Sequence, residues 1–284
     1  SVYMDGYWEN NYGNKGHGPL FQNVVFEGNQ TKWTSNNHGY RGGAMWVYRS
    51  TPYFRDVTFK NNMADGHTGG AVHVESADTN KTLMFERTTF TGNYLNNPDK
   101  EHWKRGGAIY LSEYGKAVFE SSVFDSNYIA INGDYTNEGG ALHSRHNYDS
   151  LIVRNTKFRY NKVYSPSGNN GGAAYSGAIY IAGGYGDVEI TSSLFEGNTA
   201  EAAYETWDNG GGDHSAWGGA IRVHLDYFQS NQTYFYPWQS VIANNTFINN
   251  KALSSGNDGG YGGAIRLEYG QKSTLFNNIF WGNR

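Results

Sequence analysis

Residues 106–127 read GGAIYLSEYGKAVFESSVFDSN. After the two glycines, residues 108–112 alternate between apolar and polar side chains, which is the period of a β-strand. Residues 113–116 are typical of a turn, residues 117–119 of a second short strand, and residues 123–127 of a third. The stretch shows no helical period, so we predict three short strands separated by turns.

Two phrases from this stretch recur along the chain. Gly-Gly-Ala followed by Met, Val, Ile or Leu occurs six times, and residues 176–179 (Ser-Gly-Ala-Ile) are a variant seventh copy. Phe-x-x-Asn occurs eight times, and successive copies are 31 to 52 residues apart. Self-similarity at such a period indicates a solenoid, a propeller or another repeat array. The second phrase is found at Phe26/Asn29, Phe59/Asn62, Phe90/Asn93, Phe124/Asn127, Phe158/Asn161, Phe195/Asn198, Phe247/Asn250 and Phe280/Asn283.

Aligned on these phrases, the repeats form columns of one chemical kind. The residue five places before each motif phenylalanine is large and apolar, and the residue three places before it is polar. A further apolar column follows Gly-Gly-Ala, with Ser144 as its one polar exception. Stacked about 4.8 Å apart, these columns form a continuous apolar interior. We expect the asparagine column at an inward turn, where each amide bonds to its neighbours above and below. The structural asparagines are Asn62, Asn93, Asn127, Asn161, Asn198 and Asn250.

The columns favour a solenoid over a β-propeller, because a propeller blade needs four strands and the repeat shows three. We predict an all-β fold, a single-stranded right-handed parallel β-helix of about eight coils with three strands per coil. Residues 1–284 form one domain, with insertions at residues 199–217 and 225–239. Neither end shows the polar cap that solenoids need. The chain is therefore expected to belong to a longer polypeptide, or to stack end to end with identical copies into a filament.

The alternation of Gly-Gly-Ala-[Ile, Leu, Val or Met] with Phe-x-x-Asn over residues 21–284 resembles the repeats of the chlamydial polymorphic outer-membrane proteins and related bacterial surface β-helices. This resemblance implies right-handed parallel β-helix passenger domains. It also implies display at the cell surface or secretion, adhesion and, in some members, self-assembly. The chain departs from that pattern because it contains no cysteine.

Composition excludes several classes of function. The net charge is −4 with no basic block, so nucleic acid is not an expected partner. No apolar run approaches the roughly 18 residues of a membrane-spanning helix. Residues 208–214 (Asp-Asn-Gly-Gly-Gly-Asp-His) superficially resemble a metal loop. They lack the spacing and the closing glutamate of an EF-hand. No metal ligand or cofactor is therefore assigned, with bound Ca²⁺ left open.

Residues that follow the Gly-Gly-Ala-apolar phrase are predicted to point away from the core. Arg222, His224, Arg266 and Glu268 are the best candidates for a catalytic site, similar to the face that β-helix polysaccharide lyases and hydrolases use. The alternative is a solvated strand face with cross-strand ion pairs. Catalytic sites of this kind usually gather several carboxylates, and this column does not. An enzyme is therefore the less favoured interpretation, and no catalytic residue is assigned.

The segments after the motif asparagines, among them 30–41, 94–105, 162–175 and 199–217, are long, polar and aromatic, and we predict loops there. Their aromatic rings could stack on sugars or on another protein. The alternative is that these loops fold back and bury them. Candidate binding residues are Trp103, Tyr204, Trp207, Trp217, Tyr234, Tyr236 and Trp238. Candidate glycosylation sites in loops are Asn80 and Asn231.

Together these features predict an extracellular or cell-surface structural or adhesive protein. Its expected partners are copies of itself, stacked end to end or side by side, or carbohydrate. Two alternatives stay open at this point: a carbohydrate-active lyase or glycosidase, and a glycan-binding module without turnover.

Overall fold

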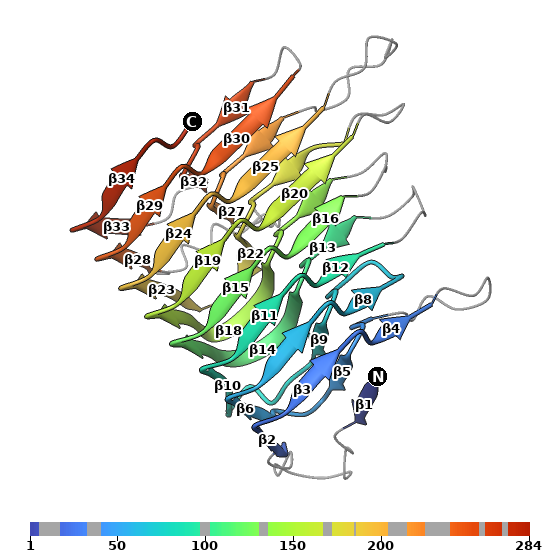
Figure 1. Ribbon diagram of the computed structural model, residues 1–284. Coiled ribbons are helices and arrows are strands. Elements are labelled where there is room, and N and C mark those ends of the chain that lie inside the picture. Colours follow the sequence, from blue (N-terminus) through green and yellow to red (C-terminus); the bar gives the residue numbers. More distant parts are fainter. Residues whose placement is uncertain are drawn as a thin grey trace, which may run out of the picture.

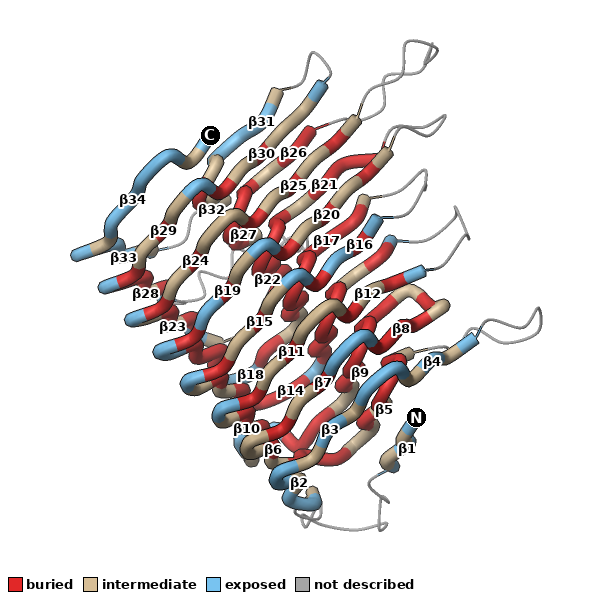
Figure 2. The backbone as a smooth tube through the Cα atoms, in the orientation of Figure 1, coloured by how far each residue is buried: buried red, intermediate tan, exposed pale blue. Residues whose placement is uncertain are grey.

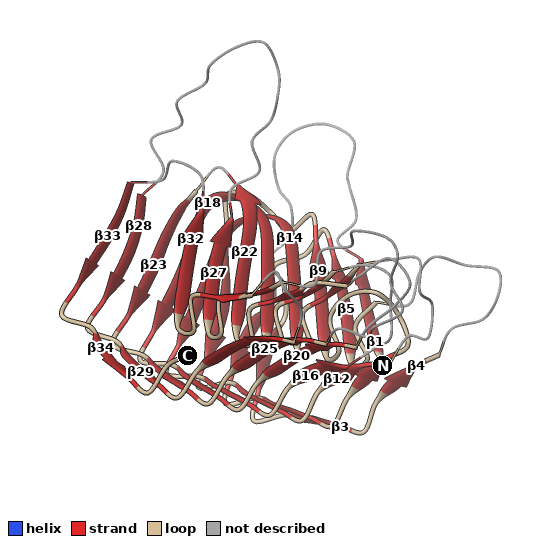
Figure 3. Ribbon diagram, turned by 90° about the horizontal axis from the view of Figure 1, so that it is seen from above, coloured by secondary structure: helices blue, strands red, loops and turns tan. Residues whose placement is uncertain are grey.

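The computed structural model describes eleven stretches of the chain, which contain strands and turns and no helix (Figure 3). Every strand pairing is parallel, and the coils stack into one elongated β-helix (Figure 1). The predicted fold class is therefore confirmed. The described residues are 1–5, 18–32, 41–96, 103–130, 136–166, 172–184, 186–203, 215–224, 239–255, 259–268 and 272–284.

The largest sheet has 14 strands in two arms. The first arm begins after each Gly-Gly-Ala, and the second arm carries the apolar residue five places before the motif phenylalanine. Two long strands run through both arms. The first arm contains β1 (Val2–Asp5), β5 (Met45–Tyr48), β9 (Val72–Glu75), β14 (Ile109–Glu120), β18 (Leu142–Arg154), β22 (Ile179–Gly184), β27 (Ile221–His224) and β32 (Ile265–Glu268). The second arm adds β2 (Leu20–Gln22), β6 (Tyr53–Arg55), β10 (Thr82–Glu86), β23 (Asp187–Thr191), β28 (Gln239–Ala243) and β33 (Lys272–Phe276).

An eight-stranded sheet, called here the Phe sheet, carries the motif phenylalanines. Successive rings from Phe26 to Phe280 stack with their centroids 4.7–5.0 Å apart and their planes within 9°. Stacking of this kind adds about 0.5–1.5 kcal/mol per pair to simple burial. Its strands are β3 (Val25–Glu27), β7 (Thr58–Lys60), β11 (Thr89–Thr91), β15 (Val123–Asp125), β19 (Lys157–Arg159), β24 (Leu194–Glu196), β29 (Thr246–Ile248) and β34 (Ile279–Trp281).

Two further sheets are formed by segments that the sequence suggests to be loops. The start of each segment after the motif asparagine pairs in a seven-stranded side sheet, and its end pairs in a five-stranded corner sheet just before Gly-Gly. The side sheet contains β4 (Gln30–Thr31), β8 (Met63–Ala64), β12 (Tyr94–Leu95), β16 (Tyr128–Ala130), β20 (Lys162–Ser165), β25 (Thr199–Ala202) and β30 (Lys251–Ser254). The corner sheet contains β13 (Lys104–Arg105), β17 (Asn137–Glu138), β21 (Ala174–Tyr175), β26 (Ala216–Trp217) and β31 (Gly260–Tyr261).

The loop prediction is therefore wrong for the two ends of these segments. They lie against each other and enclose a second apolar cluster of small and aliphatic side chains, which includes Leu95, Ile129 and Val163. The main core lies between the large sheet and the Phe sheet and runs along the inside of the coils, as the buried residues in Figure 2 show. The side and corner sheets thus widen the cross-section of the solenoid on one side.

The motif asparagines form a continuous ladder at an inward turn. In each step from Asn29 to Asn283, the amide Nδ2 donates to Oδ1 of the next asparagine along the axis, at 2.9–3.0 Å. From Asn62 onward, each Nδ2 also donates to the carbonyl oxygen of the motif phenylalanine in the preceding coil. Asn62 to Asn250 are 0% exposed, so these bonds satisfy amides that burial would otherwise penalise.

The polar column three places before each motif phenylalanine has a backbone explanation. Every member lies in the left-handed region, with φ between 48° and 58°. Asn and Asp enter this region more readily than most residues with a side chain. The column is Asn23, Asp56, Arg87, Ser121, Asn155, Ser192, Asn244 and Asn277.

The polar exception in the apolar column, Ser144, also has a structural explanation. Tyr114 is 0% exposed, and its hydroxyl lies 2.5 Å from Ser144 Oγ. Tyr114 stands where β14 continues from the first arm into the second, beside a register shift against β18. The two hydroxyls can hydrogen-bond to each other in an apolar interior, so Ser144 is polar because it is paired with Tyr114.

Among the described residues, no helix is long and apolar enough to cross a membrane.

Candidate functional site

The column just beyond Gly-Gly-Ala-apolar points away from the main core, as predicted, but much of it is not solvated. His73, Tyr110, His143, Tyr180 and Arg222 are between 0% and 6% exposed. The solvated-face interpretation is wrong for these five because the corner sheet covers this column.

Six side chains of the column contact the residue five places earlier, which stands directly before the two glycines or, for Tyr175, before Ser176-Gly177. The glycines reverse the chain, so the last corner-sheet residue faces the second residue of the first-arm strand. In the first Gly of each pair φ is positive, and a Cβ on the second would meet backbone of neighbouring coils. Contacting pairs are Arg41 with Trp46, Thr68 with His73, Glu138 with His143, Tyr175 with Tyr180, Trp217 with Arg222, and Tyr261 with Arg266.

These pairs, called here the corner ladder, change in chemistry along the axis. In the N-terminal half the corner sheet supplies the charge, as with Arg105 and Glu138, and the large sheet supplies aromatic or imidazole rings. In the C-terminal half the corner sheet supplies rings and the large sheet supplies Arg222 and Arg266. The ladder therefore ends in a cluster that is rich in arginine and aromatic side chains.

His143 forms the most buried acid–base contact of the ladder. Its Nε2 lies 3.0 Å from Glu138 Oε2, and Arg105 Nε donates to the same oxygen at 2.8 Å. Burial lowers the pKa of His143 from 6.5 to about 4, so the ring is neutral at pH 7. Burial alone would raise the pKa of Glu138, but the hydrogen bond from His143 and the charge of Arg105 outweigh it and hold the pKa at about 2.

His73 repeats this arrangement two coils earlier. Its Nδ1 lies 2.8 Å from the Thr68 hydroxyl, and its Nε2 lies 3.5 Å from Glu75 Oε2, which also pairs with Arg41. Burial lowers the pKa of His73 to about 4. Both histidines are thus neutral and buried, with almost no surface from which a substrate could reach them.

The four predicted candidates for catalysis do come together. Arg222 Nη2 and Nε donate to Glu268 Oε2 at 2.7 and 3.2 Å, and Arg266 Nε pairs with the other oxygen of Glu268. His224 Nδ1 lies 3.0 Å from the Tyr180 hydroxyl and 3.9 Å from Glu268 Oε2. Only one carboxylate is present among these residues, and both arginines engage it. Glu268 is therefore not placed as a free general base.

Two of the predicted binding aromatics lie in the described chain. Trp103 is 46% exposed, and the guanidinium of Arg105 lies 4.5 Å from the centre of one ring. Trp217 is half-buried and stacks on Tyr175 at 4.9 Å, so it folds back on the solenoid. Asn80 is exposed in the turn between β9 and β10. The remaining candidates lie outside the described residues: Tyr204, Trp207, Tyr234, Tyr236, Trp238, Asn231 and the loop 208–214.

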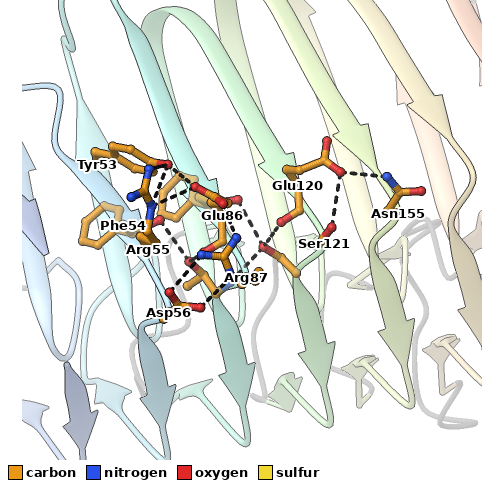
Figure 4. Close-up of polar contacts among 12 residues, drawn as sticks. Tyr53, Phe54, Arg55, Asp56, Glu86, Arg87, Glu120, Ser121 and Asn155 are labelled. Carbon is orange, nitrogen blue, oxygen red and sulfur yellow. Dashed lines mark hydrogen bonds and ion pairs between the residues drawn. The ribbon is translucent and has the colours of Figure 1, made fainter. Parts of the chain in front are cut away.

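The outer face of the second arm carries a second polar network, shown in Figure 4. Arg87 makes two hydrogen bonds to Asp56, at 2.7 and 2.9 Å, and also pairs with Glu86. Glu86 accepts further bonds from Tyr53 and Arg55. These exposed or half-exposed pairs link neighbouring coils, and such pairs contribute little each. Within the part of the chain that is described, no group of three His, Asp or Glu side chains could hold a metal ion.

The sequence reasoning missed the corner-sheet half of the ladder. Arg41, Thr68, Arg105, Glu138 and Tyr261 were not singled out, although each stands directly before Gly-Gly. A usable signal was available: the residue before Gly-Gly and the residue five places later are chemically complementary in most repeats. The pairing Glu138/His143 is the clearest example.

Comparison with known proteins links the chain to one bacterial protein. It is 29% identical over 210 residues to "Probable autotransporter YfaL" of Escherichia coli (strain K12), a match that covers 72% of this chain and 14% of that protein. The chain thus spans about a seventh of its relative's length. No protein-family model and no solved structure matches the chain. The chain is thus similar to part of a probable autotransporter, and its described residues form a parallel β-helix.

Proposed function

We propose that the chain is a β-helical segment of a protein displayed at the cell surface, where the stacked coils form a rigid stalk. The observation that carries the proposal is its similarity to the autotransporter over 72% of the chain. The fold suits this role, because continuous ladders of asparagine and phenylalanine join each coil to the next.

Surface display can be tested on intact cells of the source organism. Antibodies raised against the purified chain are expected to label unpermeabilised cells, and added protease should remove the label. A cytoplasmic protein probed in parallel controls for lysis. Label that is found only after permeabilisation would refute surface display.

We also propose that the coils can stack end to end. Phe280 stacks on Phe247 at 4.9 Å and is 48% exposed, so another coil placed on this side would extend the same column. A following coil of a longer polypeptide and a second copy of the chain would serve equally well. Light scattering over a concentration series distinguishes them for the isolated chain. A monomer at high concentration, unchanged by Phe280→Lys, would contradict self-assembly.

A carbohydrate-active enzyme is the second candidate, because Arg222, His224, Arg266 and Glu268 do meet in one cluster. A panel of polysaccharides with product detection tests it. Turnover that Arg266→Ala abolishes would favour the enzyme over the stalk. A third candidate, a glycan-binding module, predicts saturable binding without products, lost when Trp207 or Trp238 is replaced.

A further inference from the structure

We propose that the arginine-rich end of the corner ladder is a binding site for an acidic saccharide, through its carboxylate or sulfate group. The site consists of Arg222 and Arg266 with Trp217 and Tyr261 beside them. This inference concerns ligand binding by the folded chain and does not depend on where the protein is displayed.

The first argument is an unsatisfied donor. The side chain of Arg222 is only 2% exposed, yet its Nη1 has no hydrogen-bond partner among the described residues. Its Nε and Nη2 are both directed at Glu268. Leaving the N–H groups of a buried charge unpaired costs free energy, and such a group is normally paired with a protein group, an ion or a water. An incoming oxyanion would supply the missing acceptor.

The second argument is charge. Two guanidinium groups share one carboxylate, Glu268, so these three side chains together carry an excess of one positive charge. A carboxylate or sulfate can therefore bind without displacing Glu268. The pairing of arginine with planar oxyanions is geometrically favourable.

The third argument is shape and access. The guanidinium groups lie against ring faces, Arg222 on Tyr175 at 3.7 Å and Arg266 on Trp217 at 3.7 Å, which fixes their positions. Access is from the side of Arg266, which is 25% exposed, and of Tyr261, which is 50% exposed. An exposed ring next to fixed cations suits a ligand that has both a flat apolar face and an acidic group, as an acidic sugar has. An acidic peptide has the charge but offers no such face.

The test is titration calorimetry of the purified chain at low salt with three oligosaccharides of equal length: a hexuronate oligomer, a sulfated oligomer and an uncharged glucan. Binding of either acidic oligomer and not of the glucan is expected, and it should weaken as salt is added. The two acidic arms identify whether carboxylate or sulfate is preferred. Equal binding of the glucan, or no binding of any oligomer, would overturn the proposal.

Variants locate the site. Arg266→Gln is expected to reduce affinity at least tenfold, equivalent to about 1.4 kcal/mol, while Arg266→Lys retains part of it. Arg154→Gln is the matched control, since Arg154 is an ion-paired arginine on the outer face of the second arm. Circular dichroism establishes that each variant is folded, which matters most for Arg222→Gln. Two results would contradict the assigned saccharide site. One is an equal loss of affinity for the acidic oligomer in Arg154→Gln and Arg266→Gln, and the other is complete displacement of that oligomer by polyglutamate.

Discussion

At the scale of single residues, the matched pair Tyr114 and Ser144 makes a sharp prediction. Tyr114→Phe leaves the Ser144 hydroxyl alone in the core, and Ser144→Ala leaves the Tyr114 hydroxyl alone. Each change should lower the free energy of unfolding by about 1–3 kcal/mol. The double variant should lose less than the sum, because it leaves neither hydroxyl orphaned. Urea denaturation measures this, with Tyr128→Phe, at a 36% exposed tyrosine, as the control. Additive losses would show that the two hydroxyls are not coupled.

The phenylalanine and asparagine columns could be predicted from the sequence, because one residue type recurs at one position of every coil. The corner ladder could not be recognised as a column, because the residue type at each of its positions changes from coil to coil. Only the two partners within one coil, such as Trp217 and Arg222, are chemically complementary. The polar turn column was seen, but its cause, a positive φ at residues such as Asn155, is a backbone property that composition only suggests.

At the scale of elements, the corner between the corner sheet and the large sheet depends on close backbone approach. A Cβ added at Gly107 would lie 2.1 Å from the carbonyl oxygen of Gly140, in the next coil. We expect Gly107→Ala to destabilise the fold by about 3 kcal/mol or more, since two backbones must separate. Gly28→Ala is the control: its φ is +66°, but nothing lies within 4 Å, so only a conformational cost of about 1–2 kcal/mol applies. Thermal unfolding of both variants tests the difference, and equal losses would contradict the close-approach argument.

Attachment of the corner sheet should weaken in acid. His143 and His73 have folded-state pKa values of about 4, below the 6.5 of an exposed histidine. Their neutral forms therefore stabilise the fold above pH 6.5, and this stability is lost as the pH falls from 6.5 to 4. The difference corresponds to about 3 kcal/mol per histidine. Below pH 4.5 the low pKa of Glu138 adds a further loss in the same direction.

Urea midpoints measured between pH 7 and pH 4 test this pH dependence. His143→Gln keeps a donor towards Glu138 but removes the titration, so the decline between pH 6.5 and pH 4 should become shallower. An unchanged slope in His143→Gln would mean that another group governs acid stability.

The side and corner sheets themselves were not predictable from the sequence, because strands of two residues, such as Lys104–Arg105, have no detectable period.

At the scale of the whole molecule, the asparagine ladder makes each coil depend on its neighbours. The free energy of unfolding of a solenoid is approximately a sum of contributions from single coils and from the interfaces between them. A defect in a middle coil should therefore destabilise its neighbours on both sides along the axis. Asn127 donates to Asn161 and to the carbonyl of Phe90, and it accepts from both the backbone and the side chain of Asn93. Asn127→Ala thus removes ladder contacts on both sides. Asn29→Ala, at the first step of the described ladder, removes the side-chain bond to Asn62 on one side only.

We expect Asn127→Ala to lower the free energy of unfolding by about 2–4 kcal/mol, because several buried polar groups lose their partners at once. Asn29→Ala should cost about 1 kcal/mol, since Asn29 is more exposed and water can replace its bond. Hydrogen exchange followed by mass spectrometry should show faster exchange in the coils on both sides of Asn127, and only near the first coil for Asn29→Ala. Faster exchange confined to residue 127 and its immediate neighbours would show that the coils are energetically independent, and that local burial stabilises the solenoid without coupling along the asparagine ladder.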